Sequence, residues 1–290
     1  MTMKKQIIYM VCATALLSSC HIYKAYERPD SIDATGIYRD PVSETDTLAS
    51  ADTTNMGNLP WKEVFRDPKL QALIEEGLAN NVDMQAAVLR VEEAKVLLTS
   101  ARLSFLPSIN LAPQGTITKM ESSGYVKAYT APAAASWEVD LFGKLLNASR
   151  GQKASYLQSQ YSRQAVRSQL IGGIANTYYT LLMLDAQYEI SVSTEAAWKE
   201  SVRTARAMKK AGMMTEAGLA QTEATYYNIC TAVLDLKEQI NQTENSMALL
   251  LAETPHKIQR GKLENQQLPE DFSVGIPLQM LSNRPDVRSA

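Results

Sequence analysis

The sequence predicts a mainly α-helical protein that also contributes a pair of long β-strands. No proline lies between Pro132 and Pro255, and apolar residues recur through most of that stretch in steps of three and four. Residues 107–141 alternate instead between apolar and polar positions, which is typical of strands. The predicted fold is therefore a long antiparallel helical hairpin joined to a two-stranded β unit.

Composition argues against several functional classes. The 290 residues carry 29 basic and 31 acidic side chains, so there is no basic excess to bind nucleic acid. Two histidines, His21 and His256, are too few for a histidine-rich metal site. Glu138 and Asp140 share one parity of a predicted strand and are the closest approach to a carboxylate pair for acid–base chemistry. We expect no enzyme, no metal and no cofactor other than a covalent lipid.

The N-terminus reads as an export signal over residues 1–19. Lys4 and Lys5 precede an apolar run that is too short to span a bilayer and that ends in Leu17-Ser18-Ser19-Cys20. This ending resembles a bacterial lipobox, which implies cleavage before Cys20 and attachment of a lipid such as palmitate. An ordinary signal peptide with an incidental cysteine is the alternative. Residues 20–60, rich in Ser, Thr and Asp, are expected to form an extended linker.

Residues 61–106 are expected to hold the first helices. Asp67 can cap a helix that has Pro68 at its first position. Asn80 and Asn81 break this helix, and Asp83 is expected to cap the next one, which continues to about Leu106.

Residues 107–141 are expected to form two strands of about 14 residues or more, joined by a turn at 121–124. Ile109, Leu111 and Ile117 share one parity, and the second strand repeats the pattern with Tyr125, Tyr129 and a series of alanines. Such strands are long enough to cross a membrane with one face apolar. A half-buried hairpin of a soluble protein would show the same pattern.

Residues 142–252 are expected to form the helical hairpin. Its first arm, from about Leu145 to Lys210, would be about 100 Å long, far longer than a compact domain of this mass is wide. Its second arm begins at a Thr215 cap. Ten positions of that arm follow a 3.5-residue repeat: Leu219, Thr222, Tyr226, Ile229, Val233, Leu236, Ile240, Thr243, Met247 and Leu250.

Residues 253–290 contain the start of an internal repeat. Leu78, Asn80, Asp83 and Ala87 recur as Leu281, Asn283, Asp286 and Ala290, at an offset of 203. We expect a second copy of the architecture to begin there, and the 290-residue sequence to be a fragment or a truncated reading frame.

Several motifs together resemble one family. They are Leu17-Ser18-Ser19-Cys20, Trp61 with Asp67-Pro68-Lys69-Leu70, the string Trp137-Glu138-Val139-Asp140-Leu141-Phe142-Gly143-Lys144, and Asn283-Arg284-Pro285-Asp286-Val287. They resemble the TolC-type outer-membrane efflux family, in its lipoprotein, NodT-like branch. The resemblance extends from about Trp61 to Ala290, and the string from Trp137 to Lys144 is its most specific part.

The resemblance implies a homotrimer in the outer membrane of a Gram-negative-type bacterium. Residues 107–141 would be two strands of a shared β-barrel, and residues 142–252 would line a periplasmic tunnel of helices, with Glu138 and Asp140 facing its lumen. The channel would export drugs or toxic solutes with an inner-membrane pump and a periplasmic adaptor (membrane fusion protein). The adaptor would dock on the hairpin turn, which here is Lys210, Ala211, Gly212, Met213, Met214 and Thr215; a plain loop is the alternative.

A different kind of protein would share part of this sequence pattern. A lipid-anchored periplasmic coiled-coil adaptor, or a structural tether without channel activity, would also carry the lipobox and the 3.5-residue repeat. It would have no need of two long alternating strands beside the string that starts at Trp137.

The family's second strand pair would lie beyond Ala290, so three copies of this chain would supply only half of the barrel strands. Unpaired strand edges facing lipid are costly. We therefore expect no channel conductance from the purified 290-residue chain in a planar bilayer. Reproducible single-channel steps from that chain would contradict this prediction.

Overall fold

The computed structural model describes residues 60–120, 124–267 and 284–290. Within these ranges the chain forms two compact units, one of residues 92–158 and one of residues 60–91 with 159–290. The predicted signal segment, Cys20 and nearly all of the predicted linker lie outside the described residues.

The first helices begin as the sequence predicts. A short helix, α3 (Trp61–Val64), is followed by α4 (Pro68–Asn80). The carboxylate of Asp67 caps α4 by accepting a hydrogen bond of 2.9 Å from the backbone N–H of Lys69, and Pro68 occupies the first turn. Asn81 ends α4, so the predicted break is confirmed.

The predicted cap of the next helix, α5 (Val82–Leu103), is wrong by two residues. Asn81, rather than Asp83, accepts the hydrogen bond, from the backbone N–H of Met84 at 3.0 Å. The Asn81 side-chain amide also donates to the carbonyl of Leu250 at 2.9 Å, so one buried residue both ends α4 and caps α5. Asp83 lies in the first turn of α5, where the helix dipole favours an acidic side chain.

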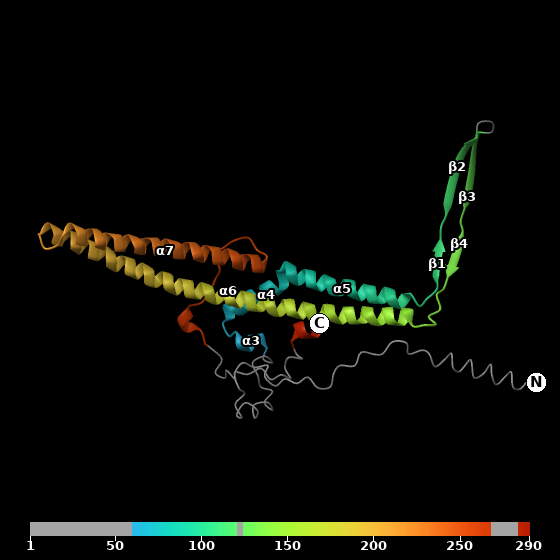
Figure 1. The fold of residues 1–290 in the computed structure, drawn as a ribbon, viewed down its shortest axis with the longest axis horizontal. Helices are drawn as coiled ribbons and strands as arrows, with labels where there is room; N and C mark the ends of the chain where they lie inside the picture. Colours follow the sequence, from blue (N-terminus) through green and yellow to red (C-terminus); the bar gives the residue numbers. More distant parts are fainter. Residues whose placement is uncertain (1–59, 121–123, 268–283) are drawn as a thin grey trace, which may run out of the picture. The chain divides into compact units, whose positions relative to one another are not determined.

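The predicted strand pair forms one antiparallel hairpin, but each long strand is divided in two (Figure 1). The strands are β1 (Ser108–Leu111), β2 (Gln114–Met120), β3 (Gly124–Thr130) and β4 (Ala133–Ser136). Pro113 and Pro132 lie at the break, where a residue without an N–H cannot donate to the ladder. The register does not shift there, because the pair Leu111–Ala133 is followed by Gln114–Thr130.

The apolar residues of the hairpin share a face, as their parity predicts. Ile109 lies opposite Ala135, Leu111 opposite Ala133 and Gly115 opposite Tyr129. The Tyr129 ring covers Gly115, where an added Cβ would lie 3.3 Å from the ring. In this single chain these side chains are exposed, Ile109 to 81% and Tyr129 to 75%.

The helical hairpin consists of α6 (Lys144–Lys210) and α7 (Glu216–Leu251), close to the predicted bounds. The glycines at 151, 172 and 173 do not interrupt α6. In Figure 1, α7 lies beside the C-terminal part of α6. All ten positions of the predicted 3.5-residue repeat in α7 are buried or half-buried, which confirms that this seam faces other parts of the chain.

The main core lies where α4 and α7 meet the middle of α6. Its buried members are Leu70, Leu73, Ile74, Leu170, Ile171, Ile174, Ala175, Tyr178, Leu181, Leu182, Met247, Leu251 and Ile258. Seven of these residues lie on α6 between Leu170 and Leu182, where they recur in steps of three and four. Gly77 of α4 permits the close approach, because an added Cβ there would lie 2.4 Å from the Ile174 methyl group.

The repeat prediction falls partly on described residues. Helix α8 (Pro285–Ser289) begins at the position that corresponds, at the offset of 203, to Val82 at the start of α5. The two copies therefore place a helix start at the same point. Between the core and α8, the described chain contains one further short helix, η3 (Leu263–Asn265).

Helix α7 ends in a conformation that suits glycine but is occupied by alanine. Ala252 has φ 58°, and the backbone N–H of Glu253 donates to Ala248 at 2.9 Å. An L-residue in this left-handed region is strained by about 1 kcal/mol or more. We predict that Ala252→Gly raises the thermal midpoint of the purified chain, followed by circular dichroism. Ala220→Gly, at an exposed position inside α7, should lower it, and a lower midpoint for Ala252→Gly would contradict the assignment.

Candidate functional site

The turn between α6 and α7, residues 210–215, is called the hairpin tip below. Helix α6 ends there in a Schellman motif: Gly212 has φ 74°, its N–H donates to Lys209 at 3.0 Å, and the N–H of Met213 donates to Met208 at 2.9 Å. Both bonds satisfy carbonyls that the end of a helix leaves unpaired. The tip is therefore a defined turn built around one glycine.

The second half of the hairpin tip starts α7. The Thr215 hydroxyl accepts a hydrogen bond from the N–H of Gly218 at 3.2 Å, so the predicted cap is confirmed. The Met213 side chain is 73% exposed, and Met214 is half-buried. The tip thus presents a flexible apolar side chain to solvent, beside the cationic end of α6 at Lys209 and Lys210.

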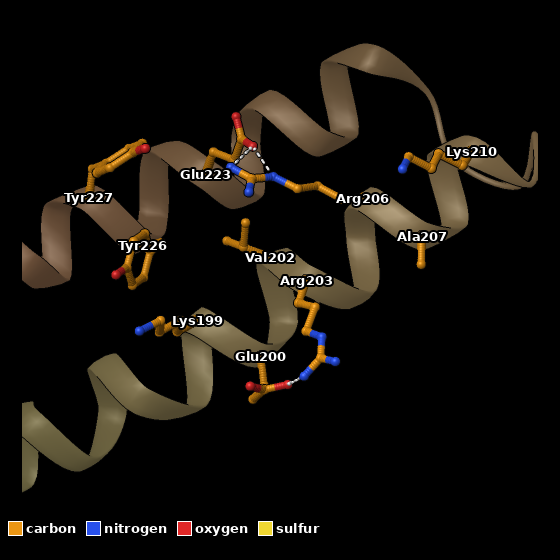
Figure 2. Close-up of a pocket in the computed structure, with 10 residues that line it drawn as sticks. All are labelled: Lys199, Glu200, Val202, Arg203, Arg206, Ala207, Lys210, Glu223, Tyr226 and Tyr227. Carbon is orange, nitrogen blue, oxygen red and sulfur yellow. Dashed lines mark hydrogen bonds and ion pairs between the residues drawn. The ribbon is translucent and has the colours of Figure 1, made fainter.

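A groove of about 640 Å³ lies beside the hairpin tip, between α6 and α7 (Figure 2). Arg206 crosses it and donates to Glu223 of α7, with Nε and Nη2 at 2.9 and 2.8 Å from one carboxylate oxygen. Val202 is buried between the helices, and Tyr226 and Tyr227 line the α7 side. Sequence reasoning identified the tip but missed this groove, which combines residues from two helices.

Glu138 and Asp140, predicted to lie on one strand face, lie beyond the end of β4 at Ser136, so the strand prediction is wrong there. The Asp140 carboxylate instead accepts from the N–H of Leu146 at 2.9 Å in the first turn of α6. Glu138 accepts from Lys144 Nζ at 2.7 Å, and this hydrogen bond raises the pKa of Lys144. Both acids thus organise the entry into α6, where the backbone makes a left-handed turn at Gly143.

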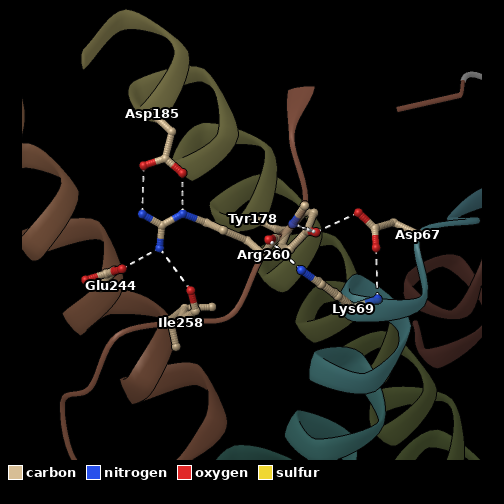
Figure 3. A network of polar contacts seen from close by, with 8 residues as sticks. Asp67, Lys69, Tyr178, Asp185, Glu244, Ile258 and Arg260 are labelled. Atoms are coloured by element: carbon tan, nitrogen blue, oxygen red, sulfur yellow. Dashed lines mark hydrogen bonds and ion pairs between the residues drawn. The ribbon is translucent and has the colours of Figure 1, made fainter. Parts of the chain in front are cut away.

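A polar network fastens residues 258–266 to the core (Figure 3). The buried Tyr178 hydroxyl donates to Asp67 at 2.6 Å and accepts from the N–H of Gly261 at 2.9 Å. Gln266 also donates to Asp67, at 2.8 Å. Burial alone would raise the pKa of Asp67, but these hydrogen bonds hold the pKa below its ordinary value.

Arg260 forms the other half of this network. Its guanidinium donates through Nε and Nη2 to the two carboxylate oxygens of Asp185 on α6, the second at 2.8 Å, and through Nη1 to Glu244 on α7. The Arg260 side chain is only 9% exposed, and Glu244 is buried. The bonds to Asp185 and Glu244 raise the pKa of Arg260, so this side chain stays charged. It thereby joins both arms of the helical hairpin to residues 258–266, called the loop below.

Residues 60–120, 124–267 and 284–290 contain no group of three or more His, Cys, Asp or Glu residues that could hold a metal ion. No helix in them combines the length and the apolar character needed to cross a membrane.

The comparison with known families decides the assignment. Residues 73–253, more than half of the chain, match the family described as outer membrane efflux protein. The chain belongs to this family. The match includes the strand hairpin, α6, the hairpin tip and α7, while Arg260 lies just outside it.

Individual efflux proteins are similar over nearly the whole chain. The toluene efflux pump outer membrane protein TtgC of Pseudomonas putida is 24% identical, over 99% of this chain and 61% of its own length. The cation efflux system protein CusC of Escherichia coli K12 is 25% identical, over 96% and 61%. The chain therefore spans about 60% of the length of these relatives.

A solved channel shares the fold. The open state of the Neisseria gonorrhoeae MtrE outer membrane channel aligns with a TM-score of 0.73 at 23% identity, covering 92% of this chain and 59% of MtrE. The predicted fold class, mainly helical with a β part, is confirmed by this likeness.

The Tyr178 hydroxyl offers a direct test of this polar network. Tyr178→Phe removes the donor to Asp67 and leaves the Gly261 N–H without its acceptor. We expect a loss of about 1–3 kcal/mol in the free energy of unfolding, and faster proteolysis within residues 255–266. Tyr227→Phe, at a side chain that is 59% exposed, should change neither quantity. Equal stability of the two variants would show that the network is not needed to hold the loop.

Proposed function

We propose that this efflux protein is the outer-membrane channel component of a tripartite efflux system. It would act as a trimer and release small toxic solutes or drugs delivered by an inner-membrane pump. The observation that carries the proposal is the family match over residues 73–253, which joins a strand hairpin and a long helical hairpin in one chain.

The exposed surface of the strand hairpin supports assembly in a membrane. Ile109, Leu111 and Tyr129 lie on one face and are 64–81% exposed. The outer edges of the hairpin also carry unpaired backbone groups within the described strands. Lipid would cover the apolar face, and neighbouring strands would satisfy the edges.

The hairpin tip is the proposed contact with a periplasmic adaptor. Its six residues, Lys210 to Thr215, form a defined turn in which Met213 is exposed and adaptable. At the other end of α6, Glu138, whose side chain is 58% exposed, and the half-buried Asp140 are proposed to face the aqueous interior, where carboxylates stay hydrated. Relatives named for toluene and for cations match 99% and 96% of this chain, so we propose that the pump, rather than the channel, selects the solute.

Membrane fractionation and oligomeric state distinguish the proposed channel from a lipid-anchored adaptor or tether. We predict that the chain, expressed with its leader in a Gram-negative host, fractionates with the outer membrane. We also expect chemical crosslinking in that membrane to capture a trimer, because the proposed subunits meet through their strand edges and helices. A chain that is released as a monomer by mild detergent would favour the tether.

Cys20 is the proposed lipid attachment site. We predict that cells fed labelled palmitate incorporate the label into the wild-type chain and not into Cys20→Ser. Cys230→Ser is the matched control, because it removes the other cysteine expected to remain after cleavage and should keep the label. Labelling of Cys20→Ser would contradict the lipobox assignment.

A further inference from the structure

Four basic residues of α6 form a stripe beside the groove near the hairpin tip. They are Lys199, Arg203, Arg206 and Lys210, called the basic stripe below. Their spacing of four, three and four residues confines them to an arc of about 60° and spreads them over about 17 Å of helix. They therefore form one continuous edge of the groove.

Only part of this charge is neutralised within the chain. Arg206 is held by Glu223. Arg203 lies 3.5 Å from Glu200, but their side chains are 81% and 68% exposed, and such pairs hold weakly in water. In the part of the chain that the structure describes, Lys199 and Lys210 make no ion pair. Residues 199–216 carry five basic and two acidic side chains in a protein whose net charge is −2.

The shape of the groove fits an elongated partner. Its walls are successive turns of two helices, and Figure 2 shows Val202 and Tyr226 between them. Tyr227 is 59% exposed and offers an aromatic surface next to the charges. A helix laid along such a groove presents side chains every three or four residues, which matches the spacing of the basic stripe.

We propose that the partner of this groove is an acidic helix whose carboxylates, at spacings of three and four residues, bind Lys199, Arg203 and Lys210. The inference rests on the proposed docking of an adaptor at the hairpin tip and adds the chemistry of that partner. Complementary charge would speed the encounter and fix the helical register, and the tyrosines would contact the apolar side of the partner helix.

The test uses the full chain in detergent micelles and two labelled helical peptides. The peptides are identical, except that one carries Glu and the other Gln at four positions spaced four, three and four residues apart. By fluorescence anisotropy we expect the Glu peptide to bind at least tenfold more tightly at low salt, with the difference shrinking as salt rises. Lys199→Glu combined with Arg203→Glu should abolish the preference. Arg163→Glu, an exposed change on the same helix far from the tip, should preserve it.

Three results would overturn the proposal. Equal binding of the two peptides would show that charge is not recognised, and equal damage by Arg163→Glu would show a general charge effect. The basic stripe would be assigned to a lipid surface instead if vesicles containing phosphatidylglycerol displaced the Glu peptide and did not bind the double variant.

A photocrosslinking amino acid in place of Met213, used in cells, distinguishes failure of this inference from failure of the docking proposal. Crosslinks to an adaptor hairpin, identified by mass spectrometry, without any Glu preference would leave docking intact and remove the acidic partner. A Glu preference without crosslinks to an adaptor would remove the docking role on which the inference rests.

Discussion

The packing of α4 and α7 against the middle of α6 is the interaction on which the helical part of the chain depends. Eight of the ten buried residues of the 67-residue α6 fall between Leu170 and Leu184. Each fully buried large apolar side chain contributes about 1.5–3 kcal/mol, so this short stretch fixes the helix to its neighbours. Elsewhere α6 buries little against the other described residues.

The buried ion pairs of Arg260 lie at the border of this core and fix the position of the loop formed by residues 258–266. Removing a guanidinium from water is costly, and two carboxylates from different helices must offset the cost at Arg260. In the structure, residues 258–266 lie where Arg260 reaches both Asp185 and Glu244. Ile258 then enters the core, and Gly261 reaches the Tyr178 hydroxyl. In physical terms the ion pairs specify where the loop lies, while the apolar contacts supply most of the stability.

The sequence predicts the features that depend on local periodicity and misses those that depend on distant pairing. The absence of proline and the 3.5-residue repeat locate α6 and α7 to within a residue or two, and Asp67 and Thr215 were recognisable caps because each precedes its helix. The bond from Arg260 to Asp185 and the bond from Asn81 to Leu250 have no local pattern, since the two partners lie 75 and 169 residues apart in sequence. The predicted second strand runs past Ser136, because the alternation of apolar and polar residues continues there in the sequence. In the structure, Glu138 and Asp140 instead bond to residues at the start of α6.

The two segments of the predicted repeat share the position of a helix start but not the contacts that begin the helix. Asp83 and Asp286 both lie in a first turn, where the helix dipole stabilises an acid in either copy. The preceding residue differs: Asn81 caps α5 and bonds to α7, whereas Arg284 pairs with Asp286, and Pro285 sets the backbone angle of α8. In the predicted repeat the two helix starts therefore keep the same register, while the contacts that begin each helix differ.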